Sequence, residues 1–507
     1  MSQNFYHFFT SRIADPNRPL FIKPDGSVVT YGAIIELSGK MANALAALGV
    51  KPDDRVVAYV DKSVGAVALY LGCLRMGAVY IPLNTAFTLK ELEFFIADAE
   101  PRAVICSTEK PDIAAALRNK LGESFGETLG TDCRSGSFAE RVAESSSSFT
   151  AVGRRGGDIA AILYTSGTTG RPKGAMLTHE NLAVNALALK DAWQMSSSDI
   201  IIHALPIFHI HGLFVAVNVS LLAGSQMIFL PKFSASEVLS YLPRATVLMG
   251  VPTFYVMMLK DKQLNADLVQ HMRLFISGSA PLLASTHTLW RERTKMEIVE
   301  RYGMTETGIL TSNPVLGERV PGTVGIPLPG VKVRITDRIT HRTLPRRKNA
   351  KIGMIEVKGP NVFAGYWQML EKTKEAFRRG KFFITGDLGF IDERGYLNIA
   401  GREKDVIITG GENVYPKEVE QEIDAIDGVM ESAVVGVPHE KFGEGVTAII
   451  VRKENVALSE QDVFDVLRKN IAGYKLPKKI IFTESLPRNA MGKVQKEELR
   501  RQYCVAC

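Results

Sequence analysis

Apolar runs alternate with longer helical patterns over the first half of the chain. Residues 55–60 form one such run, and a helical pattern near 67–76 separates it from the next run at 78–82. The runs at 101–106 and 199–203 continue the series. Strands separated by helices of this length are typical of βαβ units, so we expect mostly parallel sheets up to about residue 240.

The pattern changes after about residue 320. Short strands punctuated by glycine and proline, such as 331–335 and 353–358, favour an antiparallel sheet or a small barrel. A last unit begins near residue 401, with apolar runs at 431–437 and 446–451 and a helical pattern over 459–470. Both kinds of element are present, so this unit can form a domain of its own.

The chain has 507 residues, more than one hydrophobic core usually serves. We predict an α/β fold class with a large N-terminal domain, 1–402, made of layered βα sheets and a small β-barrel-like subdomain. A small, mobile α+β domain, 403–507, follows. Residues 212–230 are apolar but include Asn218 and Gln226, which are unfavourable in hydrocarbon. We therefore expect a buried helix followed by a strand there, and no membrane span.

Composition and charge narrow the function classes. The formal net charge is +7, but the basic residues are scattered and form no long stripe interleaved with aromatic residues. This argues against a nucleic-acid partner, and a mildly positive protein suits anionic substrates. The five cysteines are irregularly spaced, as in a reducing compartment, and the N-terminus has no signal-peptide pattern. These features predict a cytoplasmic protein.

The most informative stretch is Tyr-Thr-Ser-Gly-Thr-Thr-Gly-Arg-Pro-Lys-Gly at 164–174, directly after the apolar run 159–163. Glycines let backbone N–H groups approach phosphate oxygens, hydroxyls donate hydrogen bonds, and the lysine offsets charge. The spacing differs from the G-x-x-x-x-G-K-[ST] loop of many nucleotide-binding proteins. A plain polar turn is the alternative, but this composition favours a loop that binds nucleotide phosphates.

Four other segments have the same character. Residues 275–281 read as a strand that ends in a loop of small residues, and 301–307 offer an aromatic ring, a glycine, a hydroxyl and a carboxylate. Asp387 follows an apolar run, while Gly401-Arg402 and the segment 487–493 place cations in glycine-containing loops. Each segment alone is also compatible with an ordinary loop.

Together, the order and spacing of these segments resemble the adenylate-forming superfamily of acyl-CoA synthetases, adenylation domains and luciferases. The motifs at 164–174 and 302–306 are highly specific to that superfamily, and the resemblance covers about 30–496. The stretches 203–214, 272–281 and 301–307 look most like the malonyl-CoA synthetases. The resemblance implies that a carboxylate attacks the α-phosphate of ATP, with Mg²⁺ present, and that coenzyme A then displaces AMP to give a thioester.

The resemblance also implies roles for individual residues. Lys493, Thr305, Glu306 and His209 are the implied catalytic group, and Glu306 and Thr165 are the implied magnesium ligands. The implied ATP-binding residues are Thr165, Ser166, Gly167, Thr168, Thr169, Gly170, Lys173, Gly278, Ser279, Ala280, Tyr302, Gly303, Met304, Thr305, Asp387, Arg402 and Lys493. Lys404 occupies the hinge position, about which the C-terminal domain would rotate to bring Gly410 and Gly411 to coenzyme A.

The choice of acid depends on a second set of residues. Malonate needs a partner for its second carboxylate, and the candidates for the acyl site are His209, His211, Arg273 and Ser277. Arg273 precedes the strand that leads to Ser277, so a guanidinium–carboxylate pair would select a short diacid, although a surface arginine fits the pattern equally well. The array of His203, His209 and His211 contains no carboxylate or cysteine, which disfavours a zinc site.

Malonate is the favoured substrate, and methylmalonate is possible. Ile210 departs from the small polar residue often found at its position in malonyl-CoA synthetases, which would shift preference toward methylmalonate or a monocarboxylate. A fatty- or aryl-acid CoA ligase on the same scaffold is the main alternative. A non-catalytic nucleotide-binding protein and an adenylation module that serves a carrier protein are the others. The sequence does not predict the oligomeric state.

Overall fold

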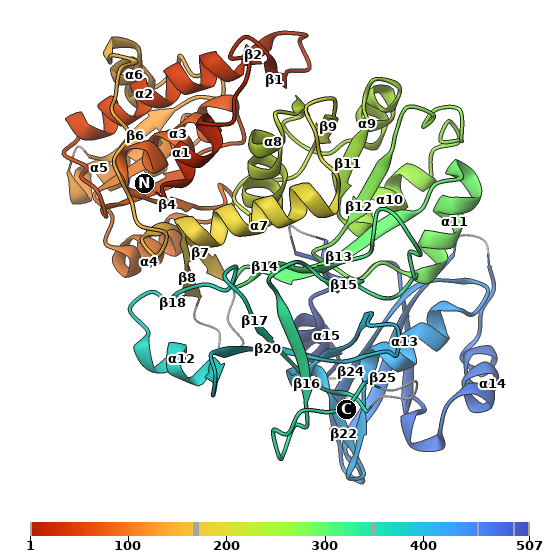
Figure 1. Cartoon of the computed structure of the whole chain (residues 1–507). Coiled ribbons are helices and arrows are strands. Elements are labelled where there is room, and N and C mark those ends of the chain that lie inside the picture. Colours follow the sequence, from red (N-terminus) through yellow and green to blue (C-terminus); the bar gives the residue numbers. More distant parts are fainter. Residues whose placement is uncertain are drawn as a thin grey trace.

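Separate hydrophobic cores divide the chain into a large and a small unit. The computed structural model describes residues 3–122, 124–165, 172–346, 351–453, 456–489 and 492–504. Core residues of the large unit end at Leu397, and those of the small unit begin at Ile407. The boundary predicted after residue 402 falls between these two residues. Figure 1 shows the small unit, in blue, beside one end of the large unit.

One sheet of the large unit carries the predicted phosphate segment. Within the described ranges it has seven strands in the order β18-β8-β7-β4-β3-β5-β6, parallel from β7 to β6, with β8 antiparallel to both β7 and β18. The strands are β3 (Arg55–Tyr59), β4 (Val79–Pro82), β5 (Ala103–Ser107), β6 (Phe125–Leu129), β7 (Ile159–Thr165), β8 (Lys173–Thr178) and β18 (Gly365–Tyr366).

The second sheet of the large unit has nine strands in the part of the chain that is described, in the order β15-β14-β13-β12-β11-β9-β10-β1-β2. The central strands are parallel, as predicted, and both edges are antiparallel hairpins. The strands are β1 (Pro19–Ile22), β2 (Val28–Thr30), β9 (Ile200–His203), β10 (Gln226–Phe229), β11 (Val247–Gly250), β12 (Leu274–Ser277), β13 (Ile298–Met304), β14 (Gly308–Ser312) and β15 (Ile326–Pro327).

A central helix connects the two sheets. The helix α3 (Val64–Met76) is buried on nearly all sides, begins at the Ser63 cap and ends at Gly77 in the left-handed conformation. It packs on β3, β4 and α2 (Tyr31–Ala47), and its Tyr70 ring lies 5.6 Å from the Phe214 ring near the second sheet. The other helices of these layers are α1 (Phe5–Thr10), α4 (Leu89–Ala99), α5 (Pro111–Leu121), α6 (Ser137–Glu144), α7 (His179–Ala192), α9 (Ala235–Tyr241), η2 (Leu242–Arg244), α10 (Pro252–Leu259) and α11 (Ala284–Thr294).

The apolar segment 212–230 folds as predicted. A π-helix, η1 (His211–Val217), continues into α8 (Asn218–Ala223) and then into β10, and the helical residues are buried. Wide π-helical turns are rare and often occur at functional sites, so η1 marks the region around His211 for attention. The helices that the structure describes include none that is long and apolar enough to cross a membrane.

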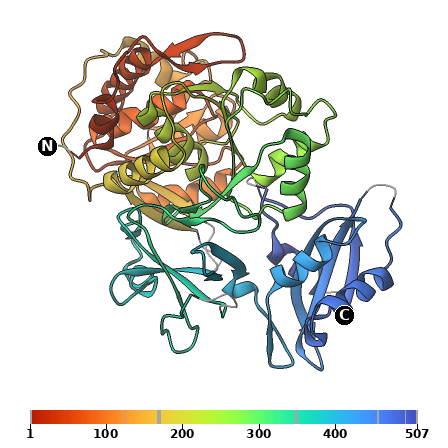
Figure 2. The same cartoon turned by 45° about the vertical axis from the view of Figure 1, so that its right-hand side comes forward.

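Two smaller antiparallel-rich sheets complete the chain. The subdomain sheet contains β16 (Lys332–Thr336), β17 (Gly353–Lys358), β19 (Phe377–Arg378), β20 (Phe382–Ile391) and β21 (Leu397–Arg402), with α12 (Leu370–Glu375) nearby. The small unit contains η3 (Glu403–Asp405), β22 (Ile407–Thr409), β23 (Glu412–Val414), α13 (Pro416–Asp424), β24 (Val429–His439), β25 (Gly443–Arg452), α14 (Glu460–Asn470), η4 (Gly473–Lys475), β26 (Lys479–Thr483) and α15 (Lys496–Cys504). Figure 2 shows its helices against one sheet. The predicted fold class is confirmed.

Candidate active site

The predicted phosphate segment begins on β7 and ends on β8, two strands that pair antiparallel. Thr165 ends β7 and pairs with Lys173, which begins β8. Ser166, Gly167, Thr168, Thr169 and Gly170 lie outside the described residues. The Tyr164 hydroxyl donates to Asp98 at 2.7 Å and fixes the end of β7. The hairpin therefore presents Thr165 and Lys173 side by side at one end of the sheet.

Glu306 lies in the turn between β13 and β14. Its side chain is 9% exposed, and the Tyr366 hydroxyl donates to Oε1 at 3.1 Å. No other described residue donates a hydrogen bond to this carboxylate, so Oε2 is available to a cation. The turn is closed by the backbone hydrogen bond from Thr307 to Met304, at 3.1 Å, which also places Thr305.

Tyr302, Asp387 and Arg402 form the predicted nucleoside side of the site. The Tyr302 hydroxyl donates to Asp387 Oδ2 at 2.5 Å, and Arg402 Nε donates to Oδ1 at 2.8 Å. Burial and the adjacent Asp387 carboxylate raise the pKa of Tyr302, so the phenol remains a donor. Each carboxylate oxygen has a second lone pair, which leaves Asp387 able to accept from ribose hydroxyls. Stacking of Tyr302 on adenine stays a prediction.

Sequence reasoning missed Arg301, which lies at the centre of the candidate acyl site. The side chain is 4% exposed, its Nη2 lies 3.5 Å from Ser279 Oγ, and its Nε has no partner in the described part of the chain. Burial lowers the pKa of Arg301 to about 9. The alternation of side chains along β13 gives a signal: Arg301 and Tyr302 point to opposite faces of the strand.

Two of the predicted acyl-site residues lie around Arg301. His211 Nδ1 is 3.2 Å from Ser279 Oγ, and Nε2 of His211 and Oγ of Ser277 are buried without a partner among the described residues. Burial, and then the positive Arg301, lower the pKa of His211 well below its ordinary value, so this ring is neutral. Ser279 itself has a φ of 74°, a strained conformation for a residue other than glycine and one typical of functional loops.

His209 lies on the same segment as His211. Burial lowers the pKa of His209 to about 4, so it also is neutral near pH 7. His203 takes a different role: its Nδ1 is 2.9 Å from Lys62 Nζ and its Nε2 is 2.8 Å from the Gly212 carbonyl oxygen. Both ring nitrogens of His203 are therefore engaged by protein groups, which opposes a metal ion at this residue.

Arg273 does not lie where the sequence analysis placed it. Its guanidinium donates to both carboxylate oxygens of Asp199, at 2.6 and 2.7 Å, and to the Trp193 carbonyl at 3.1 Å. Asp199 is 2% exposed, so this pair satisfies a buried charge at the start of β9 and β12. The structure thus corrects Arg273 from a substrate contact to a structural ion pair, because its partner comes from a distant segment.

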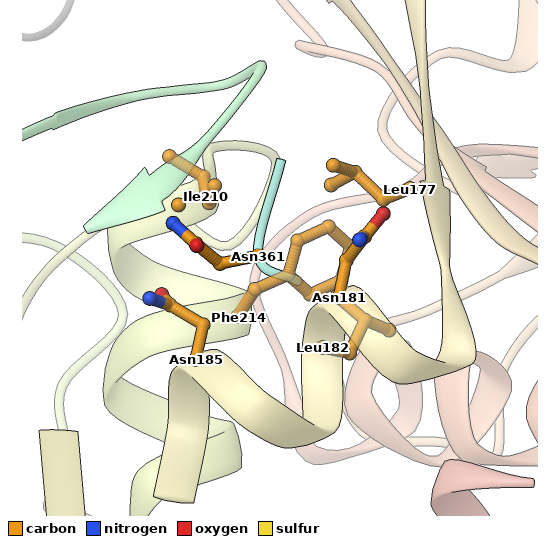
Figure 3. A pocket seen from close by; sticks show the side chains of 8 residues that line it. Leu177, Asn181, Leu182, Asn185, Ile210, Phe214 and Asn361 are labelled. Atoms are coloured by element: carbon orange, nitrogen blue, oxygen red, sulfur yellow. The ribbon is translucent and has the colours of Figure 1, made fainter. Parts of the chain in front are cut away.

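A small cavity adjoins the His209–His211 segment. It has a volume of about 10 Å³, close to the room that one water molecule needs. Figure 3 shows Asn181, Leu182 and Asn185 projecting from α7 toward Ile210, Phe214 and Asn361, which come from other segments. Asn361 Nδ2 donates to the Thr307 carbonyl at 2.6 Å, whereas its Oδ1 is buried and has no partner within the described ranges. The cavity thus suits an ordered water.

The small unit brings Lys493 to the nucleoside side. Loss of solvent contact, and then the positive Arg402, lower the pKa of the Lys493 ammonium, while the negative Asp387 opposes this shift. A Cβ atom on the preceding Gly492 would lie 2.8 Å from the Thr253 side chain of the large unit. Gly410 and Gly411 are exposed at the turn between β22 and β23.

Comparisons with known proteins agree with this arrangement. A family model described as AMP-binding enzyme matches residues 9–367, and one described as its C-terminal domain matches 418–493. The crystal structure of ATP-bound MatB from Rhodopseudomonas palustris is 54% identical over 99% of each chain, with a TM-score of 0.96. The apo form gives 0.87 at the same identity.

Two curated relatives have nearly equal sequence identity but different names. A mitochondrial malonate–CoA ligase of Mus musculus is 35% identical over 90% of this chain and 82% of its own length. A long-chain-fatty-acid–CoA ligase of Mycobacterium tuberculosis is 34% identical over 96% of each chain. Identity alone does not separate a short diacid from a long-chain acid, so the residues of the acyl site must do so.

Proposed function

Because the chain belongs to the family of AMP-binding enzymes, we propose that it is an ATP-dependent acid:CoA ligase that activates malonate. The predicted resemblance to adenylate-forming enzymes is confirmed by these matches. In the first step a carboxylate oxygen attacks the α-phosphorus of ATP, which gives an acyl-adenylate and releases pyrophosphate. In the second, the coenzyme A sulfur attacks the acyl carbonyl carbon and AMP leaves.

The observation that carries malonate is the buried Arg301 without an anion. A buried charge is costly unless it is paired, and no described residue supplies a carboxylate to this guanidinium. The second carboxylate of malonate supplies that missing charge. With the Ser279 hydroxyl donating to Nδ1, His211 Nε2 carries the ring proton and offers a second donor. A fatty acid offers neither group an acceptor.

The size of the neighbouring cavity supports the same choice. Sites for larger ligands occupy several hundred cubic ångströms. The cavity beside Ile210 and Phe214 has only about 10 Å³, enough for one water molecule, so the residues around it leave no room there for a long-chain or aryl tail. The predicted effect of Ile210, a shift toward methylmalonate, stays open on this geometry. Ser277 ends β12 with a buried hydroxyl, rather than an apolar side chain, that has no partner among the described residues.

The polar groups of the ATP side fit a nucleotide with magnesium. Glu306 is a hard oxygen ligand with one free oxygen, and the Thr165 hydroxyl is a second candidate ligand. Bound magnesium would offset phosphate charge. Lys173 and the hydroxyl-rich segment before it would hold the leaving pyrophosphate, and Asp387 and Arg402 would hold the ribose. Tyr302, with the 278–280 and 303–305 segments, would surround the base and α-phosphate.

The arrangement of the two units supports the adenylation step. The chain matches ATP-bound MatB with a TM-score of 0.96 but the apo form with 0.87. Lys493 lies near Arg402 and Asp387, where an ammonium can stabilise charge on the α-phosphate and the attacking carboxylate. We propose rotation about Lys404 for the second step, which would withdraw Lys493 and bring Gly410 and Gly411 to coenzyme A.

We also propose that the protein is cytoplasmic, because its buried cysteines are free thiols. Cys73 and Cys106 are buried free thiols, as expected in a reducing compartment. The non-catalytic alternative is disfavoured by the presence of Glu306, Lys173 and Lys493 at one site. The carrier-protein alternative requires an acceptor other than coenzyme A and is tested by the same assay.

The deciding experiment measures pyrophosphate release with malonate, methylmalonate, butanoate, octanoate and coumarate, with and without coenzyme A. We expect malonate to be preferred, and Arg301→Met to reduce its kcat/KM by roughly 100-fold while butanoate is less affected, because a site built for a charge rejects its loss. Activity confined to octanoate or coumarate would refute the malonate assignment. Release without thioester formation would favour another acceptor.

A further inference from the structure

A short segment around β18, residues 363–367, ties the Glu306 turn to the strand β8 that begins at Lys173. The Phe363 N–H donates to the Glu306 carbonyl at 2.8 Å. Next to it, the backbone at 364–367 runs along β8, with the Trp367 N–H donating to the Gly174 carbonyl at 2.7 Å. Glu306 and Lys173, which have opposite charges and are far apart in sequence, are thus held by one backbone segment.

Tyr366 contacts both charged side chains directly. Its hydroxyl donates to Glu306 Oε1 at 3.1 Å, and the Lys173 Nζ lies 4.3 Å from the centre of its ring. The tyrosine is 6% exposed, its ring packs on Phe363 at 4.8 Å, and its N–H donates to Thr373 Oγ1 at 2.9 Å. Contacts to the hydroxyl, the ring and the backbone thus fix the position of Tyr366.

This arrangement keeps two opposite charges near each other without direct pairing. Within the described residues Lys173 and Glu306 form no ion pair, although both contact the same ring. A direct pair would occupy the oxygens that a divalent cation needs and the ammonium that a phosphate needs. The ring attracts the ammonium through its face, while the hydroxyl engages one carboxylate oxygen and leaves the other available.

We propose that Tyr366 is a positioning residue that separates and orients Glu306 and Lys173 for magnesium and the ATP phosphates. The inference rests on the proposed function for the roles of these two residues. Tyr366 acts through them and does not contact the substrate. The hydroxyl sets the Glu306 carboxylate, and the ring sets the Lys173 ammonium, so the two contributions are separable by substitution.

The test uses Tyr366→Phe and equilibrium binding of a fluorescent ATP analogue to the full-length protein, with and without Mg²⁺. Loss of a hydrogen bond to a charged group predicts roughly tenfold weaker binding at saturating Mg²⁺. In EDTA the change stays within about twofold, since the ring still holds Lys173. Tyr396→Phe is the matched control, because that hydroxyl donates to the Glu318 carbonyl at 2.7 Å, outside this site.

Tyr366→Leu removes the ring as well. We expect roughly tenfold weaker binding in EDTA too, because the Lys173 ammonium loses its aromatic contact. A purely structural tyrosine predicts the opposite pattern: both variants would lower the melting temperature and weaken binding equally with and without Mg²⁺. That outcome, or a Tyr366→Phe protein with unchanged Mg²⁺ dependence, would overturn the proposal.

A double-mutant cycle with Glu306→Gln separates the hydroxyl from other causes and also corrects for any loss of stability. In the Glu306→Gln background, Tyr366→Phe should cost less than twofold, and a cost equal to that in the wild type would refute the coupling. The binding assay needs neither acid nor coenzyme A. A wild-type protein that binds MgATP but activates no malonate would therefore refute the proposed function and leave the role of Tyr366 measurable.

Discussion

A Cβ atom on Gly278 would collide with Nε of Arg301. The backbone at the end of β12 therefore lies directly against the buried guanidinium, and only glycine leaves the room that Arg301 occupies. Gly278 was predicted to border the nucleotide base, and its contact with Arg301 gives it a second function as a wall of the acyl site.

Gly278→Ala should thus impair recognition of malonate more than recognition of ATP. The added methyl group pushes the guanidinium away from Ser279 and His211, so we expect the malonate KM to rise roughly tenfold or more, as for a misplaced substrate-binding group. The KM for ATP should change less than threefold. Steady-state kinetics checks this, with Gly157→Ala as control because a Cβ there has no neighbour within 4 Å. Equal changes in both constants would contradict it.

Arg273→Met tests stability rather than specificity. The variant leaves the buried Asp199 carboxylate without its main partner, and we expect a loss of about 2–3 kcal/mol in the free energy of unfolding, discounted because Arg273 is partly exposed. The kcat/KM values for the acid panel should stay within threefold of wild type. Urea unfolding and the pyrophosphate assay measure the two effects, with the surface residue Arg291 changed to Met as control.

The pH dependence of that loss has a fixed sign. Burial opposes ionisation of Asp199, but hydrogen bonds from Arg273, Ser196 and Thr246 outweigh burial and hold its pKa below the ordinary value. The stabilisation is complete above the unfolded-state pKa of about 4 and disappears as pH falls through the folded value. The difference in the free energy of unfolding between wild type and Arg273→Met should therefore be constant near neutral pH and decrease at lower pH. A difference that increases on acidification would refute the role of Arg273 as the partner of Asp199.

The strands were predictable because their apolar runs are short and buried. Residues 55–60, 101–106 and 353–358 became β3, β5 and β17 with shifts of at most two residues. The hairpin of β7 and β8 was not predicted, since the polar tip indicates phosphate binding but does not specify which way the next strand runs. Antiparallel edges likewise depend on pairing between segments, which local pattern does not contain.

The residues of the candidate site likewise include some that local sequence predicts and others that it does not. Motifs at 164–174 and 302–306 predict ATP-binding residues because backbone approach and hydroxyl groups leave a local signature, and these roles stay predictions. Arg273 was wrongly placed and Arg301 missed, since the two arginines differ only in whether a distant aspartate pairs with them. Tyr366 carries no signature at all: its contacts to Lys173 and Glu306 join three segments that meet only in the folded chain.

Buried histidines predict how the stability of the large unit depends on pH. His179 is fully buried, and its Nδ1 accepts from the Phe5 N–H at 3.2 Å. Burial, and then Arg154, lower the pKa of His179 to about 4. The unfolded chain binds this proton at about pH 6.5, so stability falls as pH drops from 6.5 to 4, by about 1.4 kcal/mol per pH unit.

His179→Asn should remove that contribution. The variant is less stable at pH 7, but its free energy of unfolding should change less between pH 6.5 and 4.5 than that of the wild type. The reason is that unfolding of the variant takes up as much as one proton fewer. Tryptophan fluorescence reports on the large unit, since all three tryptophans precede residue 402. His341→Asn is the control, because His341 is exposed and its φ of 57° suits asparagine. Parallel pH profiles for wild type and His179→Asn would contradict the prediction.

Lys493→Ala should separate the two half-reactions. The ammonium near Asp387 and Arg402 is placed for charge that develops during adenylation, and removal of one such group costs roughly 100-fold or more in rate. Thioester formation from supplied malonyl-adenylate and coenzyme A should stay within threefold, because the proposed rotation withdraws this residue. Lys404→Pro should show the reverse, since a fixed φ restricts the hinge. Malonate-dependent ATP–pyrophosphate exchange and single-turnover thioester formation measure the two steps, with the exposed Lys479 changed to Ala as control. Equal loss of both steps in Lys493→Ala would show that the lysine stabilises the fold or both reactions, and the assignment of Lys493 to adenylation would then be wrong.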